Sequence, residues 1–208
     1  MKLSDGIKKH IDFTVYPVTW VSIIIAILTL PAIKYLPVQY GYENGLLENI
    51  QIVFLIAASV LGFMAKTNKK FFRFVALAVI ILILREINCG RTLFFAVPGT
   101  VNTFYSWKDI KYGWLAHPLY GLYMGCVGVY FIWNKLYINL WKLIKNIKFP
   151  IWNILLMILG AAAGMYAEKA MENMLLEEMT EMLFYASLMG IIWLYAFNDK
   201  FKLEENDR

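Results

Sequence analysis

Ionisable side chains lie within or at the ends of apolar runs that are long enough to cross a lipid bilayer. Charge is costly in hydrocarbon, so each of these groups must be paired, protonated, bound to a ligand or hydrated. Carboxylates can bind cations or carry protons, and arginine can hold a carboxylate or a phosphate through paired hydrogen bonds. The residues concerned are Glu48, Arg85, Glu86, Glu168, Glu177, Glu178 and Glu181. They predict a polar site inside a membrane protein.

Helix geometry places these groups in one layer. Advancing about 1.5 Å per residue from the cytoplasmic ends brings most of them, and His117, to about 21–28 Å along a core about 30 Å thick. Glu48 and Gln51 share one helix face, and Glu178 and Glu181 share another, because residues three apart are neighbours on a helix. We therefore predict that distant parts of the chain form a common acidic pocket below the outer membrane face.

The predicted pocket holds more carboxylates than cations, since six glutamates would face Arg85 and Arg91, with Lys169 as a third basic group. The excess negative charge must be met by a bound cation, by protonation or by water. A divalent or monovalent cation is therefore the expected cofactor. The expected cation- or proton-binding residues are Glu48, Glu86, Glu178 and Glu181. The expected supporting residues are Arg85, Arg91, Gln51, Glu168, Glu177 and His117. A structural network of Arg85, Glu86 and one further glutamate explains the same residues and stays open.

The elements that must position these residues are membrane helices. The chain has 208 residues, of which 60% are hydrophobic, and a mean hydropathy of +0.56. At about 20 residues per crossing, spans and short connections use nearly the whole length. We predict one transmembrane domain over residues 1–208, an all-α bundle of six transmembrane helices. The expected spans are 18–35, 46–65, 71–87, 112–133, 150–168 and 174–197.

The distribution of lysine and arginine predicts the orientation. These residues concentrate in the N-terminal segment, in the connection after the second span and in the connection after the fourth. The positive-inside rule then places both termini in the cytoplasm of a bacterial cell, with the chain in its cytoplasmic (inner) membrane. The expected cytoplasmic tails are 1–14 and 199–208, and 135–148 is expected as an interfacial helix or a solvated linker. The aromatic-rich external connection 98–111 is expected to lie in the interface or to act as a lid.

The bilayer is the expected partner. The formal net charge is +5, but the lysines lie in loops and no basic stripe with interleaved aromatics is present, so nucleic acid is not expected. Small residues favour close helix contacts in membranes. We expect Gly160 and Gly164, or Gly121 and Gly125, to serve helix packing within the chain or a homo-oligomer interface.

A short sequence recurs before two of the spans. Residues 43–48 read E-N-G-L-L-E, and residues 172–177 read E-N-M-L-L-E, an offset of 129 positions. The same offset aligns the first two spans with the last two. The recurrence predicts two repeated hairpins, as in some transporter folds. A shared preference for acidic residues at helix starts is the alternative.

Three functions remain open from the residues. A small transporter or permeation protein for a cation or proton is the first, and a non-enzymatic role is favoured. A membrane-embedded enzyme acting on a lipid-linked substrate at the outer leaflet is the second. An accessory or scaffold subunit with structural charges is the third. A zinc hydrolase needs about three good ligands, and the sequence has only His10 and His117.

One further pattern is the run L-R-E-I-N at 84–88, followed by Cys89, Gly90 and Arg91, with L-E-E at 176–178. It resembles small bacterial multi-pass inner-membrane proteins of unassigned function, which carry an Arg-Glu-Leu-Asp run at a helix end and a Leu-Glu-Glu run near the last helix. This chain has Ile87 and Asn88 where that pattern has Leu and Asp. The resemblance implies no activity, but it indicates that the arginine and acidic positions form a set.

Overall fold

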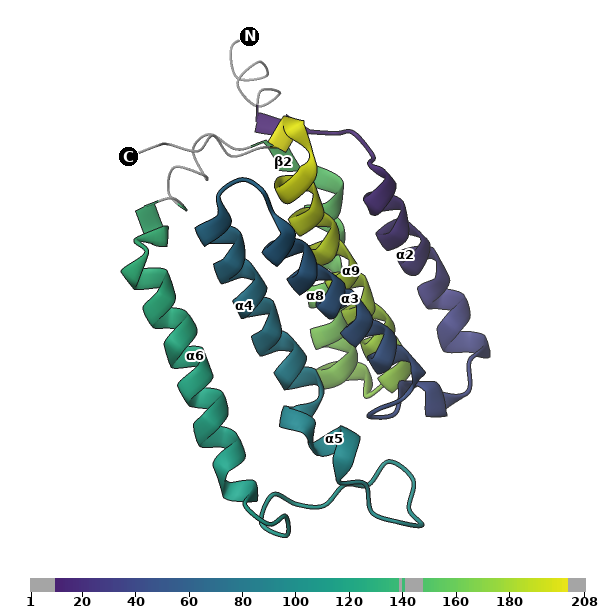
Figure 1. The fold of residues 1–208 in the computed structure, drawn as a ribbon. Coiled ribbons are helices and arrows are strands. Elements are labelled where there is room, and N and C mark those ends of the chain that lie inside the picture. Colours follow the sequence, from purple (N-terminus) through teal and green to yellow (C-terminus); the bar gives the residue numbers. More distant parts are fainter. Residues whose placement is uncertain (1–9, 139, 141–147, 202–208) are drawn as a thin grey trace.

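The computed structural model describes residues 10–138, 140 and 148–201. The fold is all-helical apart from two short strands, and a long helix lies in each of the six predicted ranges (Figure 1). These helices are α2 (Pro17–Tyr35), α3 (Leu46–Met64), α4 (Lys69–Glu86), α6 (Ala116–Trp133), α8 (Ile151–Tyr166) and α9 (Met174–Phe197). Five of the six, all except α4, are long and apolar enough to cross a membrane. The chain is therefore a multi-pass membrane protein.

Helix α4 differs from the other five in its charge. Lys69, Lys70 and Arg73 lie in its first turns, and Arg85 and Glu86 form its last turn. These charges leave a shorter uncharged stretch than in the other helices. Its apolar residues nevertheless pack inside the bundle, because Ala76 and Val79 are almost fully buried. Helix α4 thus lies among the membrane helices without the composition of a typical span.

Helix α9 is the centre of the bundle and packs against α2, α3 and α8. Leu183 and Ala186 on α9 are buried in a cluster with residues of α2 and α3. The contact with α8 is especially close, since a Cβ atom at Gly160 would lie 2.7 Å from the backbone nitrogen of Phe184. In lipid, such close van der Waals packing holds helices together. The face of Gly160 and Gly164 therefore serves packing within the chain.

Helix α6 lies at the edge of the bundle and packs mainly on α4 (Figure 1). The Tyr123 hydroxyl donates a hydrogen bond of 3.0 Å to the Leu77 carbonyl, and the rings of Phe74 and Phe131 lie 4.8 Å apart. A Cβ atom at Gly121 or Gly125 would meet nothing within 4 Å. The glycine face of α6 is thus free of contacts with the described part of the chain.

The two predicted hairpins are not equivalent in the structure. Helix α8 packs along α9, its neighbour in sequence, whereas α2 packs on α9 rather than on α3. The offset of 129 residues puts Pro31 and Tyr35 where α8 has Gly160 and Gly164. These larger residues cannot support the close contact that the glycines make. The prediction of repeated hairpins is therefore wrong at the level of helix packing.

The first and last described residues lie at one end of the bundle. Strand β1 (Ile11–Asp12) pairs in parallel with β2 (Phe149–Pro150), so this part of the expected tail 1–14 is ordered against the start of α8. The short helix η5 (Asp199–Phe201) follows α9, and the Phe201 ring lies 5.5 Å from that of Tyr16. Most of the expected interfacial helix, 139 and 141–147, and the remainder of both tails lie outside the described residues.

Short helices and loops form the opposite end. They are η1 (Val38–Gly41), η2 (Asn88–Gly90), α5 (Arg91–Phe94), η3 (Gly113–Leu115) and η4 (Ala167–Met171). The expected external connection 98–111 runs between α5 and η3 as turns, and Ala96 forms a single antiparallel bridge with Phe104. The starts of α3 and α9 and the end of α4 meet at this end. Most of the predicted polar residues lie on these helix ends.

Candidate functional site

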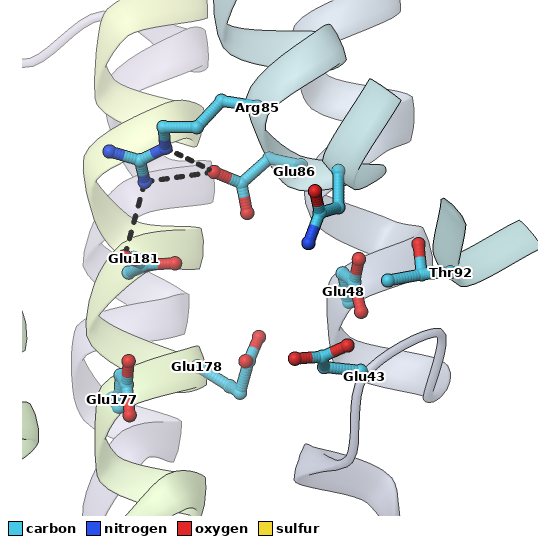
Figure 2. Close-up of a pocket in the computed structure, with 9 residues that line it drawn as sticks. Glu43, Glu48, Arg85, Glu86, Thr92, Glu177, Glu178 and Glu181 are labelled. Carbon is cyan, nitrogen blue, oxygen red and sulfur yellow. Dashed lines mark hydrogen bonds and ion pairs between the residues drawn. The ribbon is translucent and has the colours of Figure 1, made fainter. Parts of the chain in front are cut away.

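A cavity of about 250 Å³ lies where α3 and α9 begin and α4 ends. We call it the acidic pocket. Its lining comes from the loop before α3 and from α3, α4, η2, α5 and α9 (Figure 2). The lining residues are Glu43, Glu48, Arg85, Glu86, Asn88, Thr92, Glu177, Glu178 and Glu181. Segments up to 138 positions apart in the sequence thus supply one site.

The Glu48 side chain is positioned by backbone groups at the start of α3. It lies in the first turn of α3, where the helix dipole favours a negative charge. Its Oε2 accepts a hydrogen bond from the backbone nitrogen of Asn44, a residue with a left-handed φ of 58°. The residue is only 5% exposed. A carboxylate this buried in a membrane helix requires compensation beyond one hydrogen bond.

Arg85 joins α4 to α9 through a network of polar groups. Its guanidinium lies 2.8 Å from Glu86 Oε1 and 3.4 Å from Glu181 Oε1. It also donates a hydrogen bond of 3.0 Å to the Tyr185 hydroxyl, which in turn donates one of 2.6 Å to Glu86 Oε1. The Glu86 side chain is 8% exposed, whereas that of Arg85 is 56% exposed. Glu86 is therefore the buried anchor of this network, and Arg85 bridges it to α9.

Glu178 faces the pocket from α9 and is held by α3. The Gln51 side chain donates hydrogen bonds of 2.7 Å to Glu178 Oε2 and 2.8 Å to the Glu178 carbonyl. Gln51 is fully buried, and its Oε1 has no hydrogen-bond partner. Gln51 thus fixes the position of the Glu178 carboxylate without neutralising its charge.

The segment after α4 forms the remaining side of the pocket. Asn88, Cys89 and Gly90 have φ values of 44°, 52° and 90°, so two non-glycine residues in succession are left-handed. With its amide oxygen toward Arg91, Asn88 accepts hydrogen bonds of 2.8 and 3.1 Å from that guanidinium. Arg91 also lies 3.9 Å from Glu43. This turn brings Thr92 to the pocket wall, where it is 2% exposed and its hydroxyl has no partner.

The structure brings together most of the predicted site residues. Those that line the acidic pocket are Glu48, Glu86, Glu178, Glu181, Arg85 and Glu177. Gln51 lies behind the wall and holds Glu178, and Arg91 lies beside Glu43. Whether these residues bind a ligand stays a prediction.

Besides Gln51 and Arg91, two more predicted supporting residues, Glu168 and His117, do not line the pocket. Glu168 lies exposed in η4. His117 lies at the start of α6, with its ring 5.7 Å from that of Trp107. Both were assigned to the polar layer by depth alone, and depth does not say which side of the bundle a residue occupies. Helix α6 packs on the far side of α4, so His117 is carried away from the acidic pocket.

Three lining residues were not predicted as site residues: Glu43, Asn88 and Thr92. The repeated segment at 43–48 contains Glu43, and the run at 84–88 ends on Asn88, but neither pattern identifies these two residues as pocket residues. Thr92 follows a turn whose left-handed conformation is indicated in the sequence only by Asn88 and Gly90. No pattern in the sequence distinguishes Thr92 from other threonines in loops.

The pocket is acidic but not arranged as a metal centre. Six carboxylates line it, against Arg85 in the wall and Arg91 beside it. Throughout the described ranges, no three His, Cys, Asp or Glu side chains converge closely enough to hold a metal ion. The arrangement can bind positive charge, accept hydrogen bonds and exchange protons. The chain matches no protein-family model, no curated protein and no solved structure.

Proposed function

We propose that the protein is a small membrane transporter or permeation protein that binds a cation or protons in the acidic pocket. The observation that carries this proposal is the charge of the lining. Six carboxylates share a cavity of about 250 Å³ with one arginine in the wall and a second beside it. Two of these carboxylates, Glu48 and Glu86, are buried, and the repulsion within the group is costly unless a cation, protons or water offset it. We propose that a cation or protons do so.

The residues have distinct roles in this proposal. Glu48 and Glu178, on opposite elements, contact the bound cation or carry protons. Arg85 positions Glu181 and Glu86 and limits the negative charge on that side of the pocket. Gln51 positions Glu178.

We further propose six membrane crossings, with α4 as the sixth span. The contact between Tyr16 and Phe201 supports an even number of crossings, because it holds both described ends on one side. Ala65 and Phe72, which flank the lysine-rich α3–α4 connection, are buried with Ala196 near that same end. The positive-inside rule then places this end in the cytoplasm and the acidic pocket toward the outside of the bacterial inner membrane.

The test combines binding with transport. Purified protein is titrated with cations in detergent while thermal unfolding is followed, and proton-coupled cation flux is measured in proteoliposomes with a pH-sensitive dye. Glu48→Gln and Glu178→Gln should each abolish cation-dependent stabilisation and flux. The matched control is Glu172→Gln, since Glu172 is exposed and lies outside the pocket. Unchanged binding and flux in both pocket variants would overturn the proposal.

A membrane-embedded enzyme is the second candidate, and one observation favours it. The consecutive left-handed residues Asn88 and Cys89 hold a costly backbone conformation at the pocket wall. Such conformations cluster at active sites and ligand clamps. In this alternative the carboxylates act as general acid and base on a lipid-linked head group, and Arg91 holds a phosphate. Turnover of lipid-linked substrates by proteoliposomes, lost in Glu178→Gln, would favour the enzyme over the transporter.

A further inference from the structure

A cluster of basic side chains lies at the end of the bundle opposite to the acidic pocket, and we call it the basic surface. It comes from the connection between α3 and α4, from the first turns of α4 and from the turn that follows α6. All of its members are exposed, and they are Lys66, Lys69, Lys70, Arg73 and Lys135. Figure 1 shows the start of α4 and the end of α6 at the same end of the bundle as strand β2.

The basic surface lacks carboxylate partners. Within the described part of the chain, none of its five cations forms an ion pair. The sequence has no Asp or Glu between positions 49 and 85 or between positions 110 and 167, so α6, α8 and most of α3 and α4 carry none. The Asp12 carboxylate, at the same end of the bundle, accepts hydrogen bonds from Thr14 and Tyr16. The positive charge of this surface is therefore left for an anion from outside the chain.

The two helices that carry the basic surface are in contact at this end. The Tyr130 hydroxyl donates a hydrogen bond of 3.4 Å to the Lys70 carbonyl, and the rings of Phe74 and Phe131 lie 4.8 Å apart. Lys135 follows Tyr130 by only five positions in the sequence. Because lysine side chains are long and flexible, one phosphate at this contact can meet cations from both helices.

Exposed apolar side chains adjoin the basic surface. Val129 and Ile132 are exposed in the last turns of α6, and Trp133, the last residue of that helix, is 84% exposed. Such residues face acyl chains in a membrane protein, and tryptophan is enriched at the level of the lipid headgroups. A phospholipid carries its phosphate next to its acyl chains, so it complements cations that adjoin apolar side chains. A free phosphate ion complements the cations alone.

We propose that the basic surface binds an anionic phospholipid of the adjacent leaflet, with its phosphate at the contact of α4 and α6 and its acyl chains along the apolar face of α6. Basic clusters directly beside the end of a membrane helix attract anionic lipids. The bound lipid adds to the attachment of α6, which packs mainly on α4. This proposal does not depend on the acidic pocket, so its failure leaves the proposed function as it stands.

The experiment measures lipid binding to the full chain in detergent by native mass spectrometry. The probes are phosphatidylglycerol, which is anionic, and phosphatidylcholine, which is zwitterionic, with identical acyl chains. The Kd for phosphatidylglycerol should lie at least about tenfold below that for phosphatidylcholine. The triple variant Lys69→Gln, Lys70→Gln, Arg73→Gln should weaken phosphatidylglycerol binding at least about tenfold and change phosphatidylcholine binding little. Lys135→Gln alone should weaken phosphatidylglycerol binding severalfold.

The matched control removes the same net charge at the opposite end of the bundle. It is the triple variant Lys108→Gln, Lys111→Gln, Lys169→Gln, in which all three lysines are exposed. The Kd for phosphatidylglycerol should stay within about twofold of the native value. A large excess of inorganic phosphate should not displace the lipid from the native chain, because phosphate makes no contact with the apolar face of α6.

Three results would overturn the proposal. Equal affinity for the two lipids, or no binding of phosphatidylglycerol, would show that the surface does not select an anionic headgroup. Equal weakening by the two triple variants would show a diffuse attraction to the net charge of the chain rather than a site on α4 and α6. Displacement by inorganic phosphate would show that the surface recognises phosphate without the lipid. Circular dichroism of both triple variants establishes that their helices are intact.

Discussion

The Tyr185 hydroxyl lies 2.6 Å from Glu86 Oε1 and 3.0 Å from the Arg85 guanidinium, so one phenol joins the buried acid to its basic partner. Tyr185 is 1% exposed, so a variant without the hydroxyl leaves too little space for a water molecule to donate the missing hydrogen bond to Glu86. Tyr185→Phe should therefore lower the free energy of unfolding by about 1–3 kcal/mol. Thermal unfolding in detergent measures the change.

The control for Tyr185→Phe is Tyr166→Phe on α8. Tyr166 is 62% exposed on the outer face of the bundle, so loss of its hydroxyl should change stability little. Equal destabilisation by the two substitutions would show that the Tyr185 hydrogen bonds contribute nothing specific to stability.

Removing Arg85 tests whether the charge network is structural. Arg85→Ala leaves Glu86, at 8% exposure, without its ion pair. Because Arg85 itself is 56% exposed, part of the interaction is screened, and we expect a loss of about 1–3 kcal/mol rather than the 3–5 kcal/mol of a fully buried pair. The double variant Arg85→Ala with Glu86→Gln should recover part of this loss, since no unpaired charge remains.

Arg73→Ala is the matched control for Arg85→Ala, because Arg73 is an exposed arginine in the same helix. It should be close to neutral. A scaffold function instead predicts that Arg85→Ala unfolds the protein while Glu48→Gln and Glu178→Gln leave both stability and cation binding unaltered. Chemical denaturation of all four variants, followed by tryptophan fluorescence, distinguishes the two cases.

The bounds of the helices could be predicted from the sequence, because each helix is an apolar run that ends at polar or charged residues. The predicted spans 46–65 and 174–197 match α3 and α9 within one residue at each end. Helix α4 was predicted too, but the charges at both of its ends prevent composition alone from identifying it as a span. The packing partners of the helices were harder to predict from the sequence. Gly160 contacts α9 because it has no side chain, and sequence periodicity does not identify which helix a glycine face meets.

The pocket could be predicted in part, because charged side chains within membrane helices pair with one another or face the interior of the bundle. Glu48, Glu178 and Glu181 were grouped by depth and helix face, and all three line the pocket. His117 shares their depth but belongs to α6, whose position beyond α4 depends on tertiary packing. Thr92 reaches the wall through a left-handed turn at Asn88 and Cys89. Asparagine and glycine adopt this conformation more readily than other residues, so Asn88 and Gly90 indicate a turn, but no pattern predicts a left-handed Cys89.

The contact between α8 and α9 depends on the absence of a side chain at Gly160. A Cβ atom there would lie 2.7 Å from Phe184 N and 2.8 Å from the Thr180 carbonyl, so the two backbones must move apart. Gly160→Ala should therefore destabilise the protein by about 1–3 kcal/mol, measured by thermal unfolding. Gly125→Ala on α6 is the matched control, because a Cβ atom there meets nothing within 4 Å.

Gly125→Ala should be neutral or slightly stabilising, since alanine is the better helix former. If Gly160→Ala is equally neutral, α8 and α9 do not approach as closely as the structure shows. If Gly125→Ala instead lowers the stability or the oligomeric mass of the detergent-solubilised protein, the glycine face of α6 is covered by a second copy. Light scattering of the two variants reports that mass.

Asp12 gives the protein a pH-dependent contribution to stability at the end opposite to the acidic pocket. Burial alone would raise the pKa of Asp12, but hydrogen bonds from Thr14 and Tyr16 and the charge of Lys200 outweigh it and lower that pKa. The folded state therefore favours the ionised form. Its contribution is present above the unfolded pKa of about 3.9 and is lost as the pH falls through the lower folded value.

The corresponding variant is Asp12→Asn. It should unfold at a lower temperature than the native chain at pH 7, and the difference should shrink as the pH falls below about 4. Asp109→Asn, at an exposed turn, should show no such dependence. A difference between Asp12→Asn and the native chain that stays constant from pH 7 to pH 3 would contradict the assigned role of the ionised carboxylate.

The proposed crossing by α4 can be tested through the connections at its two ends. If α4 spans the membrane, residue 66 before it and residue 100 after it face opposite compartments. Both Lys66 and Thr100 are exposed, so Lys66→Cys and Thr100→Cys should tolerate the change. In a background without Cys89 and Cys126, a membrane-impermeant maleimide added to intact cells should label the cysteine at 100 alone. After membranes are opened, both should react. Labelling of both positions in intact cells, or of neither, would place the two connections on one side and remove α4 from the set of spans.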